Sequence, residues 1–202
     1  MRKILSMSDA DEILDKYYPM ISSSISEGFN DYLLVTKCLS QEGRQIDFRP
    51  RTIASLVHDF IKSHVKEKFL GIEGIEARDF NEVFGLSINR KLFIRFKKLN
   101  PDFSTSNIPT RQTLALNYQQ TLEGFPDEPT FIIAGYMPNA TWTSITNIYL
   151  LCNEGERVLW MKDLNNIQIE QKSFEFIDQE EKAVTKLVRA KLPLLETGTD
   201  SK

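Results

Sequence analysis

Residues 90–98 are rich in basic side chains, and these are the residues best suited to bind another molecule. If the segment is a β-strand, one face carries Lys91, Phe93, Arg95 and Lys97. The intervening residues are apolar and should point into the core. Lysine and arginine bind phosphates and carboxylates, so this face indicates a contact surface for nucleic acid or another anion. A solvated basic face that protects a sheet edge from aggregation is the alternative.

The loop that follows this segment adds donors for the same chemistry. It is rich in hydroxyl and amide groups, which commonly hydrogen-bond to phosphate oxygens. The candidate binding residues in and just after the loop are Ser104, Ser106, Asn107, Thr110 and Arg111. We expect strand and loop to form one anion-binding surface.

A second basic face is predicted on a helix that begins near residue 50. Arg51, His58, Lys62 and Lys66 lie on one side of this helix, opposite its apolar stripe. We interpret this face as solvated. The segment after the helix has strand periodicity, so the sequence does not favour a helix-turn-helix motif.

The spacing of the two histidines does not indicate a metal site. His58 and His64 are six residues apart, and no HExxH motif is present. We therefore expect no metal and no cofactor. His64 falls within the apolar stripe and should be partly buried and hydrogen-bonded.

No catalytic motif is recognisable, but one enzymatic alternative stays open. Restriction-type nucleases carry a carboxylate, one residue and a lysine on a strand, whereas here Arg95 stands before Phe96 and Lys97. Glycine-rich phosphate loops and G-x-S-x-G elbows are also missing. We expect a non-enzymatic binding or regulatory protein. A degenerate or unrecognised metal-dependent nuclease is the alternative, with surface carboxylates such as Glu73, Glu76, Asp79 and Glu82 as its candidate ligands.

The apolar periodicity predicts an α+β fold. Residues 8–39 have a helical pattern interrupted at Pro19, the segment after residue 50 is a second helix, and five short strands follow. We expect N-terminal helices packed on an antiparallel sheet of about five strands. Residues 1–164 should form a single domain, and residues 165–202 a polar C-terminal extension with a helix.

Composition and charge restrict the location and the partners. The sequence lacks an apolar run long enough for a membrane span, and acidic residues soon follow its start, so we expect a cytoplasmic protein without a membrane partner. Residues 44–112 hold 13 Lys and Arg against 8 Asp and Glu, although the whole chain has a net charge of −3. This basic middle favours an acidic partner, nucleic acid or protein. An apolar stripe within residues 21–36 is compatible with intramolecular packing and with a homo-oligomer.

Several short segments resemble an uncharacterised bacterial family. They are residues 93–99, 106–112, 135–136 and 148–152, followed by Trp160. Members of that family are small proteins frequently encoded beside an ImmA/IrrE-type zinc peptidase, and the likeness covers residues 21–164. The resemblance implies a partner of such a peptidase in a regulatory, toxin–antitoxin-like or phage-defence cassette. It assigns no catalytic residues.

Overall fold

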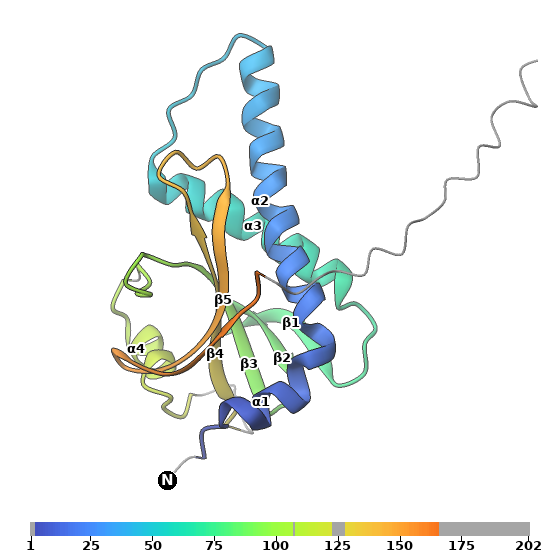
Figure 1. Ribbon diagram of the computed structural model, residues 1–202, viewed down its shortest axis with the longest axis vertical. Coiled ribbons are helices and arrows are strands. Elements are labelled where there is room, and N and C mark those ends of the chain that lie inside the picture. Colours follow the sequence, from blue (N-terminus) through green and yellow to red (C-terminus); the bar gives the residue numbers. More distant parts are fainter. Residues whose placement is uncertain (1–2, 107, 123–127, 166–202) are drawn as a thin grey trace, which may run out of the picture. The chain divides into compact units, whose positions relative to one another are not determined.

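The computed structural model describes residues 3–106, 108–122 and 128–165 (Figure 1). The helical elements are α1 (Met7–Leu14), the short 3-10 helix η1 (Asp15–Tyr17), α2 (Tyr18–Gln41), α3 (Pro50–Lys68) and α4 (Arg111–Asn117). The strands are β1 (Ile75–Phe80), β2 (Val83–Ile88), β3 (Leu92–Lys98), β4 (Thr130–Pro138), β5 (Ile145–Glu154) and β6 (Arg157–Asp163). Within the described ranges, no helix combines the length and apolar character needed to cross a membrane.

The α+β class predicted from the sequence is confirmed, with helices followed by a sheet. The sheet has six strands in sequence order, and not five. The strand missed by the sequence prediction is β1, an edge strand whose sequence IEARDF is mostly polar. Its exposed positions remove the apolar alternation by which a strand is recognised.

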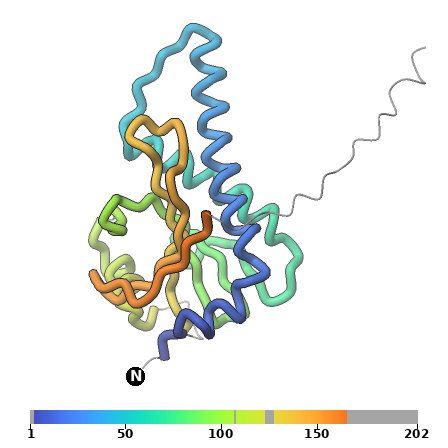
Figure 2. Tube along the Cα trace, viewed as in Figure 1, coloured from blue at the N-terminus to red at the C-terminus, as the bar shows by residue number. Residues whose placement is uncertain are grey.

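The sheet is mixed, which corrects the expectation of an antiparallel sheet. β3 and β4 run parallel, with Leu92 beside Thr130 and Lys98 beside Tyr136, whereas all other neighbours are antiparallel. Parallel neighbours need a crossover connection. Figure 2 shows the chain leaving β3 in green and returning as β4 in yellow after passing through the segment that contains α4.

The main core lies between one face of the sheet and the helices α1, α2 and α3. Leu92, Ile94 and Phe96 of β3 belong to this core, as the strand alternation predicted. Pro19 also acts as expected, because it lies in the first turn of α2 and separates this helix from α1. Proline tolerates this position because the first helical N–H groups have no partner within the helix.

Two smaller apolar clusters cover the other face of the sheet. One joins Phe93 of β3 to Phe80, Phe131 and Leu116, and Leu116 lies on α4. The second contains Leu99, Ile133 and Leu151. β3 is therefore buried on both faces, which the parallel crossover makes necessary.

Helices α2 and α3 are joined by polar contacts beside their apolar faces. His64 Nε2 lies 2.7 Å from Asp31 Oδ2, and Lys68 Nζ donates to Glu27 Oε1 over 2.9 Å. His64 is thus partly buried and hydrogen-bonded, as predicted.

The N-terminal segment is attached to strands far along the chain. The backbone N–H of Leu5 donates to Thr130 Oγ1, and Trp160 Nε1 donates to the carbonyl of Leu5, both over 3.0 Å. Lys162 Nζ donates to Asp11 Oδ2 over 3.2 Å. These bonds connect the start of the described chain to β4 and β6.

The predicted C-terminal extension, residues 165–202, lies outside the described residues except for Asn165. The helix expected there and the boundary at residue 164 remain predictions.

Gly28 marks the closest approach of α2 to α3. A Cβ atom at this position would lie 2.6 Å from the backbone nitrogen of Ile61 and 2.9 Å from its Cα. We expect Gly28→Ala to lower the free energy of unfolding by about 1 to 3 kcal/mol, because overpacking outweighs alanine's better helix propensity. Chemical denaturation measures this effect. Asn30→Ala, at an exposed position of the same helix, should be neutral or slightly stabilising; an equal loss in both variants would contradict the packing argument.

Candidate anion-binding groove

A groove opens at the carboxyl end of β3, between the first half of α3 and the start of α4. Its volume is about 790 Å³. The lining residues are Pro50, Arg51, Ala54, Ser55, His58, Asp59 and Ile61 from α3, Phe96, Lys97 and Lys98 from β3, Tyr136 from β4, and Ser106, Ile108, Thr110 and Thr113 from the loop and α4.

The groove exists because β2 leaves β3 early. β2 pairs with β3 only through Leu86–Ile88, whereas β4 accompanies β3 over its whole length. The rest of β2 pairs with β1, and the turn of that hairpin reaches α4, where Gln112 Nε2 donates to the carbonyl of Asn81 over 2.7 Å. One side of the last β3 residues is left without a strand.

Positive charge predominates along the groove. Arg51, Lys97 and Lys98 line it, and none of the three forms an ion pair with a carboxylate of the described residues. Lys98 Nζ instead donates to the neutral Asn100 Oδ1 over 3.2 Å. Asp59 is the acidic member of the lining, and its carboxylate lies 3.7 Å from Nδ1 of His58. The groove is thus predisposed to take an anion.

The electrostatics of the groove indicate uncompensated cations. Burial lowers the pKa of Lys97, and the charge of Arg95 lowers it further. Burial also lowers the pKa of His58, followed by repulsion from Lys97. A bound anion would raise the pKa of both Lys97 and His58, because a neighbouring negative charge favours their protonated forms.

The floor of the groove contains an unpartnered polar group. Tyr136 is 1% exposed, and its hydroxyl has no hydrogen-bond partner among the described residues. Leaving a buried hydroxyl unsatisfied costs about 1 to 3 kcal/mol, so such groups usually have a ligand or water partner. The other aromatic residue of the lining, Phe96, is also only 1% exposed. The floor of the groove therefore holds an unpaired, buried hydroxyl, and the rings of Phe96 and Tyr136 are not open to a ligand.

The first turn of α3 adds to the positive potential. The helix begins with Pro50, and its N-cap residue Arg49 makes no side-chain capping hydrogen bond. The N-terminal end of a helix has a partial positive charge, which supports the adjacent cations.

The structure brings only part of the predicted surface into this groove. Lys97, Ser106 and Thr110 line it together. Lys91 is an exposed turn residue that precedes β3, at the end of the strand away from the groove. Asn107 lies outside the described residues.

The predicted exposed face of β3 is wrong at two positions. Phe93 is fully buried in the cluster beneath α4, and Arg95 is only 2% exposed. The two do share a face with Lys97, but the crossover covers that face. Arg95 donates from Nη2 to Asn117 Oδ1 over 2.9 Å, and its Nε has no partner among the described residues. Burial lowers the pKa of Arg95 to about 10.

The hydroxyls of two predicted residues serve the local structure. Thr110 caps α4, because its Oγ1 accepts from the backbone N–H of Thr113, whose own Oγ1 accepts from the N–H of Thr110. Ser104 Oγ donates to Asp102 Oδ1 over 2.7 Å. These contacts fix the loop beside the groove.

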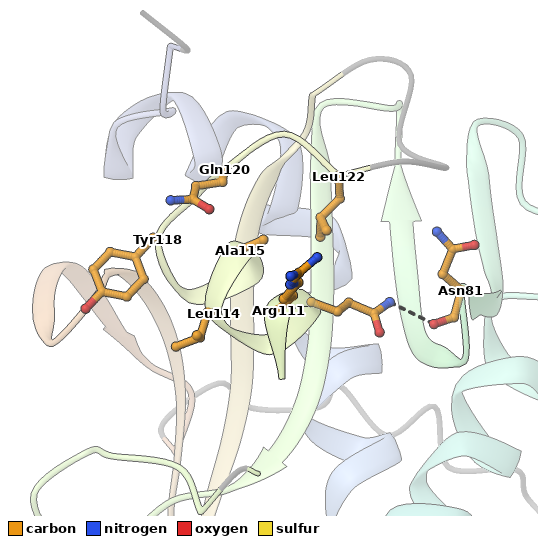
Figure 3. A pocket seen from close by; sticks show the side chains of 8 residues that line it. Asn81, Arg111, Leu114, Ala115, Tyr118, Gln120 and Leu122 are labelled. Atoms are coloured by element: carbon orange, nitrogen blue, oxygen red, sulfur yellow. Dashed lines mark hydrogen bonds between the residues drawn. The ribbon is translucent and has the colours of Figure 1, made fainter. Parts of the chain in front are cut away.

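Arg111 lies at a separate hollow on α4 (Figure 3). This hollow has a volume of about 820 Å³ and is bordered by Leu114, Tyr118 and Leu122. It is more apolar than the groove at β3. Arg111 is therefore not brought together with Lys97.

Sequence reasoning missed several groove residues. It placed Arg51 and His58 on a solvated helix face, whereas the structure turns both toward β3. Lys98 was assigned no role. It is in phase with the core positions Leu92, Ile94 and Phe96, but it lies at the strand end, where the core stops. Tyr136 carries no polar pattern around it that would distinguish it from core tyrosines.

The carboxylates considered for a nuclease do not gather. Asp79 is paired with Lys62, and Glu76 with Arg78. Over the described residues, no three His, Cys, Asp or Glu side chains come together in an arrangement that could hold a metal ion.

Comparisons of the chain with protein-family models, with curated proteins and with solved structures find no match.

Arg95 permits a test of whether this buried charge costs stability. We expect Arg95→Met to raise the free energy of unfolding by about 1 to 3 kcal/mol, because methionine fills the space without an unpaired buried charge. Arg95→Glu should destabilise, because it buries a carboxylate beside apolar residues. Urea denaturation compares the two variants with the parent. A marked loss of stability in Arg95→Met would show that the guanidinium is needed for the fold.

Proposed function

We propose that the protein is a non-enzymatic binding protein whose groove at the end of β3 takes an anionic partner. The observation that carries this proposal is the set of three cations, Arg51, Lys97 and Lys98, which line one groove without an ion-pair partner among the described residues. Cations on ordinary surfaces are commonly solvated one by one. Here burial also penalises Lys97, which favours compensation by a ligand.

Two further features support binding of an anion. Arg95 lies behind Lys97 in an apolar environment, where its field is weakly screened and adds to the potential of the groove. The hydroxyl of Tyr136 supplies an unused donor at the floor. Functional sites often carry residues that lower stability, and a buried cation behind the groove fits that pattern.

The resemblance of residues 21–164 to proteins encoded beside ImmA/IrrE-type peptidases suggests the setting. In our proposal the groove serves a regulatory, toxin–antitoxin-like or phage-defence cassette, through a partner protein, a nucleic acid or both.

The proposal is tested with two anionic polymers, duplex DNA and poly-glutamate, titrated at two salt concentrations. We expect Lys97→Glu to weaken binding at least about tenfold, because one cation becomes an anion at the centre of the groove. Lys91→Glu is the matched control: it makes the same change just before the same strand, at an exposed turn position outside the groove. Its affinity should stay within about twofold of the parent.

The outcomes separate the groove from general charge. Selective loss in Lys97→Glu supports the proposal. Equal weakening in both variants would show that affinity depends on the net charge of the protein and not on the groove, which would contradict the proposal. Absence of binding to either polymer at low salt would also overturn it.

Binding of an anion in the groove should be coupled to protonation of His58. Its pKa lies below 6.5 in the free groove, where Lys97, Lys62, Asp59 and Asp79 surround it. An anion raises this pKa, so binding takes up a proton. Affinity should therefore strengthen as the pH falls through and below 6.5, by about three- to tenfold between about pH 7.5 and about pH 5.5. Calorimetry in two buffers of different ionisation enthalpy measures the proton uptake, and the uptake should vanish in His58→Gln. An unchanged pH dependence in that variant would assign the proton elsewhere.

A further inference from the structure

β1 is an edge strand whose outer side is accessible. Among the described strands it pairs with β2 alone. The side chains of Glu76, Arg78 and Asp79 are 50%, 62% and 45% exposed, and Ala77 is half-buried. Of the strand's residues only Phe80, at its end, is buried. Another strand can therefore approach this edge.

The pairing with β2 determines which backbone groups of β1 face outward. Phe80 pairs with Val83 across a two-residue turn, and the carbonyl of Gly74 accepts from the N–H of Asn89 over 2.7 Å. Even-numbered residues of this strand therefore hydrogen-bond to the neighbouring strand. Since successive residues of a strand direct their backbone groups to opposite sides, the N–H and carbonyl groups of Ala77 and of the other odd-numbered residues face the free edge.

The charges of β1 make the strand complementary to itself. Glu76 and Arg78 lie on either side of Ala77 and carry opposite charges. If two copies pair antiparallel about Ala77, Glu76 of each copy lies opposite Arg78 of the other. Within one copy, Arg78 Nε already donates to Glu76 Oε2 over 2.9 Å. The four side chains would thus form a square of alternating charge, and opposite charges on facing strands stabilise their pairing.

Neighbouring registers of such a pair are disfavoured. A shift of the centre by one residue places Glu76 opposite its own copy, or Arg78 opposite its own copy. A centre at Asp79 places two aspartates opposite each other, and a centre at Ile75 leaves little of the strand paired. Like charges that face each other across a sheet are destabilising. Edge charges usually prevent pairing of edges, but these charges leave one register open.

We propose that the protein forms a homodimer in which the β1 edges of two copies pair antiparallel about Ala77 and join the two sheets. The two Ala77 residues exchange N–H···O bonds, and the N–H of Asp79 donates to the carbonyl of Ile75 in the second copy. A two-fold contact requires that each residue's partner be reciprocal, and the Glu76 and Arg78 pairs meet this condition. The contact is small beside stable interfaces, so we expect a weak dimer whose amount rises with protein concentration.

This inference is independent of the proposed anion binding. No residue of β1 lines the groove at the end of β3. Lys97→Glu should therefore leave dimer formation unchanged, and failure of either proposal leaves the other standing.

A charge exchange tests the pairing, with sedimentation velocity over a concentration series as the measurement. We expect Glu76→Arg and Arg78→Glu to weaken the dimer at least about tenfold each, because each variant places like charges opposite each other twice. The double variant with both changes should return to within about threefold of the parent. Arg157→Glu is the matched control, because it makes the same change at an exposed position of β6, the other edge strand.

Cysteine cross-linking tests the register. In a Cys38→Ser background, which removes the exposed thiol, we expect a mixture of Glu76→Cys and Arg78→Cys proteins to form an intermolecular disulfide. Glu76→Cys alone should form little, because its two copies lie diagonally, at about 7 to 8 Å, beyond the usual reach of a disulfide.

Hydrogen exchange tests the main-chain bonds. The amides of Ala77 and Asp79 should exchange at least about fivefold more slowly when the protein is mostly dimeric than when it is mostly monomeric. The amides of Glu76 and Arg78 are internal controls, because they already face β2.

The outcomes decide the proposal. Rescue by the charge exchange, together with cross-linking of the mixture, supports it. A protein that stays monomeric up to about 1 mM would overturn it. A dimer that the single β1 variants do not weaken, or that Arg157→Glu weakens equally, would place the contact elsewhere and overturn it as well.

Discussion

The parallel pairing of β3 with β4 is the constraint on which the rest of this structure depends. Every other pair of neighbouring strands is antiparallel, so this one pair breaks an otherwise continuous meander. A parallel neighbour cannot be reached by a tight turn, and the chain must cross one face of the sheet between Leu99 and Thr130. That crossover places α4 opposite α2 and α3. It thereby converts a sheet with one covered face into one that has a core on both sides.

The same constraint explains the unusual environment of the basic residues on β3. Strand alternation assigns Phe93, Arg95 and Lys97 to the α4 face. The exposure of each depends on whether the segment that contains α4 covers it. Phe93 contributes to an aromatic cluster, Arg95 is enclosed with a single neutral side-chain partner, and Lys97 emerges at the strand end. A buried cation behind a half-buried one maintains a positive field that solvent screens poorly. The polar character of the groove therefore derives from topology as much as from surface composition.

Local patterns in the sequence were sufficient for much of the fold but not for its long-range pairing. The helical stripes, the break at Pro19 and the core residues of β3 follow from periodicity, which is a property of neighbouring residues. The parallel partner of β3 is not such a property, because nothing in residues 92–98 specifies whether β4 approaches in one direction or the other. The burial of Arg95 was mispredicted for this reason. The groove was recognised in part through Lys97, Ser106 and Thr110, whereas Arg51, His58 and Tyr136 join it only through tertiary packing.

The bonds of Leu5 impose an order on the biosynthesis of this protein. Leu5 donates to Thr130 and accepts from Trp160, so its native partners lie 125 and 155 residues further along the chain. During translation, the helices that follow can assemble with one another as soon as they emerge from the ribosome. The segment before them must wait until the last described strand has been made. Attachment of this segment is thus a late event, because a residue made before the helices is secured only after the sheet has been made.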